Sequence, residues 1–329
     1  MSKKKMFRFV NFDKPGKGVT KEEAEKRAKN RYSFGNFFFL SGRNVPLFAM
    51  LNLLFLLTNL FIFSALLALS GNYDTFHLVP SNGMFQTAAG IAAASPSGST
   101  MSLLGIAGSV NAIGYPSVTT YILYAVAALT VFTFGPTSAG LAYVLRGVAR
   151  GDYVDLTDYF KAIKKNFWQS LLLGVLDLFV MFIFGYAVYF YFLQSAGGFV
   201  YQVMYFLSLF FFLIYLMMRS FLYLLIVTFK LSIFKAIKNS YILTIAGIRR
   251  NITALIGGGL AIALNVILFV IFPPIGAILP FIFTIVIISF MGVFAAYPTV
   301  KRLMIDPYYP EAAEEESVEQ EEPIFRDMG

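Results

Sequence analysis

Long runs without charged side chains are the feature that most constrains this chain. Residues 251–300 are 50 consecutive positions without Asp, Glu, Lys or Arg, and residues 44–73 and 75–145 form two further runs. A helix needs about 20 apolar residues to cross a bilayer, so each run can supply at least one span. Charged residues make up 13% of the chain, whereas soluble domains carry about a quarter. The sequence therefore predicts an all-α, polytopic membrane protein.

Six transmembrane helices are predicted. Pro273, Pro274 and Gly276 favour a turn inside the longest run and divide it into two antiparallel spans. The predicted spans are residues 45–69, 121–145, 170–193, 200–227, 253–272 and 276–297. They define a basic N-terminal segment with an interfacial helix (1–44), a membrane domain (45–300) with an outer loop (70–120), and an acidic tail (301–329) that we expect to be disordered.

Lys and Arg are unevenly distributed among the segments between these spans. Residues 1–44 hold 12, residues 146–169 and 228–252 hold five each, and three follow Val300. The alternate segments hold none. Because basic residues are retained in the cytoplasm, we expect both termini to be cytoplasmic and the outer loop to lie outside. The basic N-terminal segment should also contact anionic membrane lipids.

Two segments outside the spans have helical signals. Thr20 and Glu23 have the spacing of a capping box, which predicts a short charged helix to about residue 30. In the outer loop, residues 101–113 are compatible with a short re-entrant or membrane-resting helix and also with an irregular loop.

Residue types that carry catalysis are scarce. The chain has no Cys and one His, which excludes disulfides and thiolate metal sites. No phosphate-binding G-x-x-x-x-G-K-[ST] loop occurs, so the chain does not supply its own ATPase. The net charge of +8 is divided among short segments between apolar runs, which argues against nucleic acid as a partner. We expect no catalytic residues, no metal and no cofactor.

Asp177 and Arg219 are the charged residues inside predicted spans. Asp177 precedes Gly198 by 21 residues, and Arg219 follows it by 21. At about 1.5 Å per residue, a tight hairpin brings them to nearly the same depth on neighbouring helices. An unpaired charge in hydrocarbon costs at least ~2.5 kcal/mol, so we expect the two to pair. Their role is either a clamp between helices or part of a substrate or proton path.

Gly135 and Pro136 lie inside the second predicted span. Proline removes one backbone hydrogen bond and clashes with the preceding turn, so a kink or break of the helix is expected there. Such a break is compatible with a plain kink and with a transporter binding site.

A five-residue repeat occurs in the two inner loops. Its first copy is Phe160, Lys161, Ala162, Ile163 and Lys164, and its second is Phe234, Lys235, Ala236, Ile237 and Lys238. Apolar residues at helical spacing, Leu156, Phe160, Ile163 and Phe167, predict an amphipathic helix with its lysines turned away. Phe234, Ile237 and Tyr241 predict a second one. Each helix is either a lipid-resting elbow or a docking surface for a cytoplasmic protein.

Short motifs are spread over most of the chain. They are residues 12–19 (FDKPGKGV), residues 135–141 (GPTSAGL) leading into Val144, Leu145 and Arg146, then Gly151, residues 158–160 (DYF) with Lys165 and Asn166, Thr228 with Phe229, and residues 238–240 (KNS) followed by residues 249–251 (RRN). In order and spacing they resemble the YesL-like family of bacterial integral membrane proteins, a domain of unknown function, in its extended-loop subgroup. Lys230 stands where many members have an acidic residue, so site chemistry is not carried over.

The resemblance implies about six helices and a location in the plasma membrane. Members commonly accompany carbohydrate ABC importers and glycan-degrading enzymes, which implies an accessory role in sugar uptake. The first hypothesis is therefore a non-enzymatic accessory or regulatory subunit that associates with an ABC permease or a solute-binding protein. The alternative is an autonomous small-solute transporter or channel that uses Asp177 and Arg219. A membrane enzyme is the weakest hypothesis, and the sequence specifies no oligomeric state.

Overall fold

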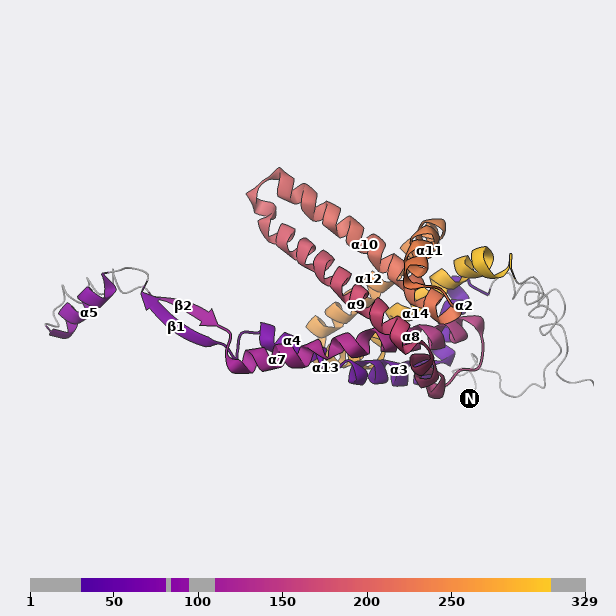
Figure 1. Ribbon diagram of the computed structural model, residues 1–329, viewed down its shortest axis with the longest axis horizontal. Helices are drawn as coiled ribbons and strands as arrows, with labels where there is room; N and C mark the ends of the chain where they lie inside the picture. The colour runs from indigo at the N-terminus through magenta and orange to yellow at the C-terminus, as the bar shows by residue number, and fades with distance from the viewer. Residues whose placement is uncertain (1–30, 81–83, 95–109, 309–329) are drawn as a thin grey trace, which may run out of the picture. The chain divides into compact units, whose positions relative to one another are not determined.

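The computed structural model describes residues 31–80, 84–94 and 110–308 (Figure 1). The predicted charged helix at 20–30, residues 101–109 of the outer loop and the acidic tail from residue 311 lie outside this part of the chain. The described residues divide into two compact units, and the boundaries fall at Phe55 and Gly135. The larger unit contains residues up to 55 and from 135 onward, and the smaller unit contains residues 56–134.

Five helical segments of the described chain are long and apolar enough to cross a membrane, and these segments make the chain a multi-pass membrane protein. They contain the last five predicted spans, except for Phe272 at the end of the span predicted over residues 253–272. In chain order they are Val118–Arg150, Leu156–Gly197, Phe199–Thr228, Ile248–Ile271 and Pro273–Ile305.

The first predicted span, residues 45–69, is wrong as a single helix. It consists of α3 (Val45–Thr58) and the eight-residue α4 (Ile62–Leu69). Between them, Asn59, Leu60 and Ile62 donate backbone hydrogen bonds to the third residue before them, so the chain winds more tightly than an α-helix. The preceding α2 (Phe34–Arg43) meets α3 at 76°, and a sixth span is counted only if this bent pair is taken together.

The larger unit is built around a helical hairpin. α9 (Leu156–Gln194) and α10 (Phe199–Thr228) run side by side and are joined by the short turn η1 (Ser195–Gly197), as Figure 1 shows. Gly198 closes the turn with φ 142°, a conformation that favours glycine. The unit also contains most of α8 (Thr130–Arg150), followed by α11 (Ile233–Ala246), α12 (Ile248–Ile271), α13 (Pro273–Leu279), the π-helical η2 (Pro280–Thr284), α14 (Ile285–Val300) and η3 (Lys301–Ile305).

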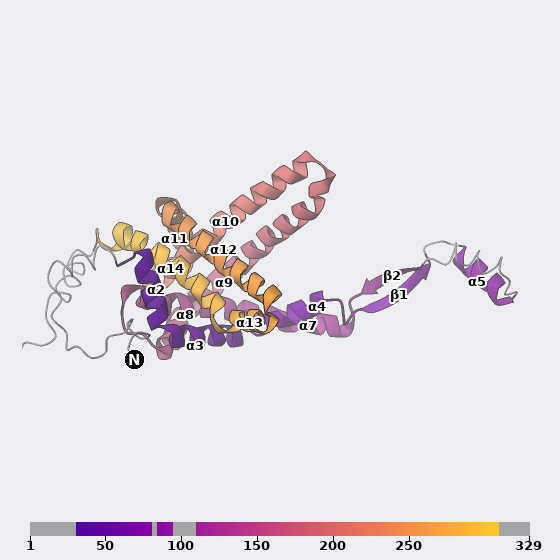
Figure 2. The ribbon, with the colours of Figure 1, turned by 180° about the vertical axis from the view of Figure 1, so that it is seen from behind.

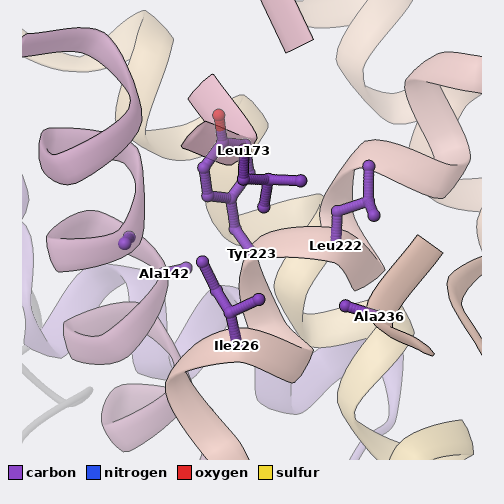
Figure 3. Close-up of a cluster of buried hydrophobic side chains, with 7 residues drawn as sticks. Ala142, Leu173, Leu222, Tyr223, Ile226 and Ala236 are labelled. Atoms are coloured by element: carbon purple, nitrogen blue, oxygen red, sulfur yellow. The ribbon is translucent and has the colours of Figure 1, made fainter. Parts of the chain in front are cut away.

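The core of this unit lies along the middle of α8, the first half of α9 and the last part of α10. Figure 3 shows a cluster of buried side chains from these helices and α11, namely Ala139, Ala142, Leu173, Leu222, Tyr223, Ile226 and Ala236. Three of the seven are alanines, and small residues allow helix backbones to come close in a membrane. The core therefore depends on backbone approach as well as on large side chains.

The closest approach joins α8 to α9. A Cβ atom added to Gly135 would lie 2.1 Å from the backbone oxygen of Ser170, and one added to Gly174 would lie 2.4 Å from the Cα atom of Gly135. Any side chain at either position would collide with backbone. These two glycines therefore set the separation of the helices.

Of the kink or break predicted at Gly135 and Pro136, the break is not present. α8 is continuous through Pro136, and the change of hydrogen bonding comes earlier, where Leu129 and Phe132 donate to the third residue before them. Pro136 removes one backbone donor, but every residue from Gly135 to Ala142 is buried. Packing on this segment holds the helix together across the missing bond, as neighbouring helices do for other membrane prolines.

One of the two π-helical turns in the described part of the chain, η2, is hydrogen-bonded by a buried side chain from α3. Asn52 donates from Nδ2 to the backbone oxygens of Pro280 (2.9 Å) and Phe281 (2.6 Å). Its Oδ1 accepts from the backbone nitrogen of Val286 at 3.1 Å. In hydrocarbon, backbone groups released by a π-helical turn need such partners. Asn52 thereby joins α3 to the start of α14.

The smaller unit is a second helical hairpin extended by a β-ribbon. α4 packs against α7 (Val118–Ala128), and Ser64 Oγ donates to the backbone oxygen of Leu123 at 2.9 Å. Beyond them, β1 (Thr75–Pro80) pairs antiparallel with β2 (Val110–Tyr115), and Thr75 lies opposite Tyr115. The ten-residue α5 (Phe85–Ala94) lies between the strands in sequence.

The β-ribbon corrects the expectation for the outer loop. A helix over residues 101–113 would include positions 110–113, and these belong to β2. The pairing partner of each residue is 30 to 40 positions away in the chain, so local helical spacing did not reveal it.

Gly174→Ala tests the contact between α8 and α9. The added methyl group collides with backbone, and overpacking of this kind costs about 1–3 kcal/mol of unfolding free energy. We expect a lower midpoint of thermal unfolding in detergent. The matched control is Gly185→Ala in the same helix, where an added Cβ meets nothing within 4 Å. Equal midpoints for the two variants would contradict the proposed contact.

Candidate functional site

A cluster of four polar side chains lies between α9 and α10. Arg219 Nε is 2.7 Å from Oδ2 of Asp177 and donates to it. The hydroxyl of Tyr223 donates to the same oxygen at 2.7 Å, and the hydroxyl of Tyr215 donates to Oδ1, also at 2.7 Å. The structure thus brings Asp177 and Arg219 together and surrounds the carboxylate with three donors. We call these four residues the aspartate cluster.

The two tyrosines were missed in the sequence analysis, although the sequence contains a signal for them. Tyr215 and Tyr223 lie four residues before and four after Arg219, so all three share one face of α10. A search for polar side chains at helical spacing from an intramembrane charge would have found both.

The aspartate cluster lies where the hairpin leaves the core of the larger unit. The buried residues of α10 are Phe221 to Ile226, which begin two positions after Arg219. In α9 the last buried residue is Asp177. Farther along both helices are exposed apolar side chains, among them Phe182, Tyr186, Phe206 and Phe210. Asp177 and Arg219 therefore mark the boundary between packed and exposed parts of this hairpin.

The chemistry of the aspartate cluster is that of a satisfied ion pair. The Asp177 side chain is 0% exposed and the Arg219 side chain is 28% exposed. A buried carboxylate is tolerated when charge and hydrogen bonds compensate for the loss of water. Here each carboxylate oxygen accepts at least one hydrogen bond. The arrangement holds two helices in a fixed register.

Gly135 is linked to the aspartate cluster through its contact with Gly174. It packs on Gly174, which precedes Asp177 by three residues on α9. Tyr223 also packs in the core cluster with Ala139 of α8. Gly135 and Pro136 therefore belong to a packed helix beside the ion pair, and the structure gives them no role in a helix break.

The two copies of the five-residue repeat have similar environments. In both, the alanine is buried, and Ile237 packs on the core cluster. Ile163 lies against the face of α8 at Gly140. The phenylalanine side chains are not part of the core, since Phe160 is 46% and Phe234 is 85% exposed. The four lysines of the repeat are exposed as well, namely Lys161, Lys164, Lys235 and Lys238. We call these exposed Phe and Lys side chains the Phe–Lys faces.

The first of these helices is continuous with the membrane span. Residues 156–165 belong to α9, which bends at Asn166 (φ −114°, ψ 17°). Asp155 caps its start and accepts hydrogen bonds from Thr157 Oγ1 (2.6 Å) and from the backbone nitrogen of Thr157 (2.8 Å). These bonds, the hydroxyl first, lower the pKa of the Asp155 carboxyl. The bend at Asn166 lets this part of α9 run in a direction different from the span.

Two of the motif residues, Arg146 and Thr228, are in contact. Arg146 Nη1 donates to the backbone oxygen of Val227 and to Oγ1 of Thr228, both at 3.0 Å. Arg146 also lies over the ring of Tyr143, 4.8 Å from its centre. This contact ties the end of α8 to the end of α10.

Among the described residues, no group of three or more His, Cys, Asp or Glu side chains is placed to hold a metal ion.

A double-mutant cycle tests the Asp177–Arg219 pair. Asp177→Asn or Arg219→Gln leaves one buried charge without its partner, which costs about 3–5 kcal/mol for pairs of this kind. We expect each single variant to lower folded yield and unfolding midpoint, and the double variant to lose less than the sum. The readout is the folded fraction in detergent. Additive losses would contradict the pairing. Tyr215→Phe and Tyr223→Phe each remove one hydroxyl that donates to Asp177, and Tyr186→Phe, at an exposed position, is their control.

Comparison with known proteins gives one match. Residues 48–188 match the model of a family described as "Protein of unknown function, DUF624". The matched residues include α8 and the part of α9 that contains Asp177, and they end before Arg219. No curated protein and no solved structure matches the chain. Over less than half of its length the chain is thus similar to a family whose function is not known.

Proposed function

We propose that this protein is a non-enzymatic, multi-pass subunit of the plasma membrane with both termini in the cytoplasm. In this proposal it is an accessory or regulatory partner of a carbohydrate ABC importer, and it binds the permease or solute-binding protein. The positive-inside distribution of Lys and Arg supports the orientation. The two Phe–Lys faces then lie on the cytoplasmic side, where they are available to another protein.

The exposure of Phe234 is the observation that carries the proposal. This ring is 85% exposed at the start of α11, and the exposed Lys235 and Lys238 lie beside it in sequence. Aromatic side chains are enriched where proteins bind one another, and few residues usually supply most of the binding energy. The same combination occurs at Phe160, which offers a second anchor.

The aspartate cluster supports an accessory role over transport. A residue in a proton or substrate path has to exchange its hydrogen-bond partners. The Asp177 carboxylate is instead fully buried, and three donors are directed at it. This geometry suits a clamp between α9 and α10. The association with carbohydrate import rests on the resemblance to the YesL-like family described above.

Copurification tests the proposed partner. The full chain is isolated from its native membrane in mild detergent, and we expect an ABC permease or a solute-binding protein to copurify. Phe160→Ser and Phe234→Ser should each lower recovery of the permease about tenfold, because loss of one anchor on the cytoplasmic side costs about 1.4 kcal/mol or more. Tyr153→Ser, another exposed aromatic residue near the start of α9, is the control. Absence of both importer components would contradict the proposal.

An autonomous transporter or channel is the second candidate. The partly exposed side chain of Arg219, inside a span, is the observation that favours it. In liposomes this candidate predicts flux of small sugars or protons that disappears in Asp177→Asn. Our proposal predicts flux no greater than that of protein-free liposomes. Measured flux that depends on Asp177 would replace the accessory role with transport.

A further inference from the structure

An apolar cavity lies in the larger unit between α2, α12 and α14, three helices that Figure 2 shows next to one another. Its volume is about 800 Å³. Phe37 and Phe38 of α2 form one wall, Leu260 and Leu264 of α12 form another, and Met291 of α14 lines the third side. Neither the aspartate cluster nor the Phe–Lys faces contribute to it.

One end of the cavity is basic. Arg250, near the start of α12, lines it together with Tyr32 and Thr253. Arg250 Nη2 donates to the backbone oxygen of Tyr32 at 2.5 Å, which uses one of the five N–H donors of the guanidinium. Among the residues that the structure describes, none of those lining the cavity is acidic. An anion at this end would therefore meet a positive charge that is already held in position.

The rest of the cavity is a long apolar surface along α12. Gly257, Leu260, Ala261 and Leu264 have the spacing of one helix face. Fourteen residues separate Arg250 from Leu264, which is about 21 Å along the helix. A bilayer core is about 30 Å thick, so this face reaches past the middle of the membrane. The Met291 sulfur lies against Gly257, 3.1 Å from where a Cβ atom would be, so the exposed Leu260 and Leu264 supply the accessible part of this face.

We propose that this cavity binds one anionic phospholipid, with its phosphate at Arg250 and an acyl chain along Leu260 and Leu264. The basic end matches the headgroup and the apolar face matches an acyl chain of a phospholipid in the leaflet on the side of Arg250. A peptide segment would bring backbone donors and acceptors into an almost wholly apolar lining, where they would lack partners. The proposal rests on the membrane location and is independent of the importer association.

Native mass spectrometry of the full chain tests this site with phosphatidylglycerol and phosphatidylcholine that have identical acyl chains. We expect phosphatidylglycerol to remain bound preferentially. Arg250→Gln should reduce that preference about tenfold, because the headgroup loses its cation. Leu260→Trp should reduce binding of both lipids, because Leu260 is exposed and the larger ring fills the cavity. Ile262→Trp, exposed on the same helix and outside the lining, should change neither.

Three results would overturn the proposal. Equal retention of both lipids, unaffected by Leu260→Trp, would indicate general lipid contact. Loss of the bound lipid on addition of inorganic phosphate alone would indicate a phosphate site without an acyl-chain site. No retained phosphatidylglycerol on the full chain, with retention after deletion of residues 1–30, would show that the chain's own N-terminal segment occupies the cavity. Because Arg250 also contacts Tyr32, the unfolding midpoint of Arg250→Gln is measured alongside, and Leu260→Trp decides the outcome if that variant unfolds.

Discussion

The cost of placing a carboxylate among apolar helices is the constraint on which the larger unit depends. Asp177 must find donors within the protein, because hydrocarbon provides none. Arg219, Tyr215 and Tyr223 provide them from one face of α10. These bonds can form in only one register of the two helices, so the depth of α10 relative to α9 is set by a single buried charge. The tight turn at Gly198 is consistent with that register.

Close backbone contacts complete this arrangement. Lipid tails are as apolar as leucine, so helices in a membrane associate through packing, and small residues allow the nearest approach. Gly135 and Gly174 bring α8 onto α9 three residues before Asp177, and Gly292 brings α14 onto Ser220 of α10. The same contacts leave two surfaces without cover within the larger unit, the Phe–Lys faces and the cavity beside Arg250. They differ in chemistry, which is why a protein is proposed for one and a phospholipid for the other.

Much of this architecture could be predicted because it depends on length, charge and residue count. Five spans follow from apolar runs longer than about 20 residues. The common depth of Asp177 and Arg219 follows from equal distances to one turn. Other features depend on partners far away in the chain, and no local pattern marks them. Pro136 by itself predicts a kink or break, but α8 packs on Gly174 and is continuous. Residues 45–69 by themselves predict one helix, but the chain winds more tightly after Thr58.

By itself, the sequence determined that the chain is a helical, multi-pass membrane protein with one pair of intramembrane charges and little catalytic chemistry. Only the tertiary structure decided how that pair is satisfied, which side of each five-residue repeat faces the core, and where an apolar cavity meets an arginine. The physical reason is that hydropathy and charge are properties of single residues, whereas burial and hydrogen bonding are properties of neighbours. Ala162 and Ala236 are buried and Phe160 and Phe234 are not, because alanine lets the helices approach and phenylalanine does not.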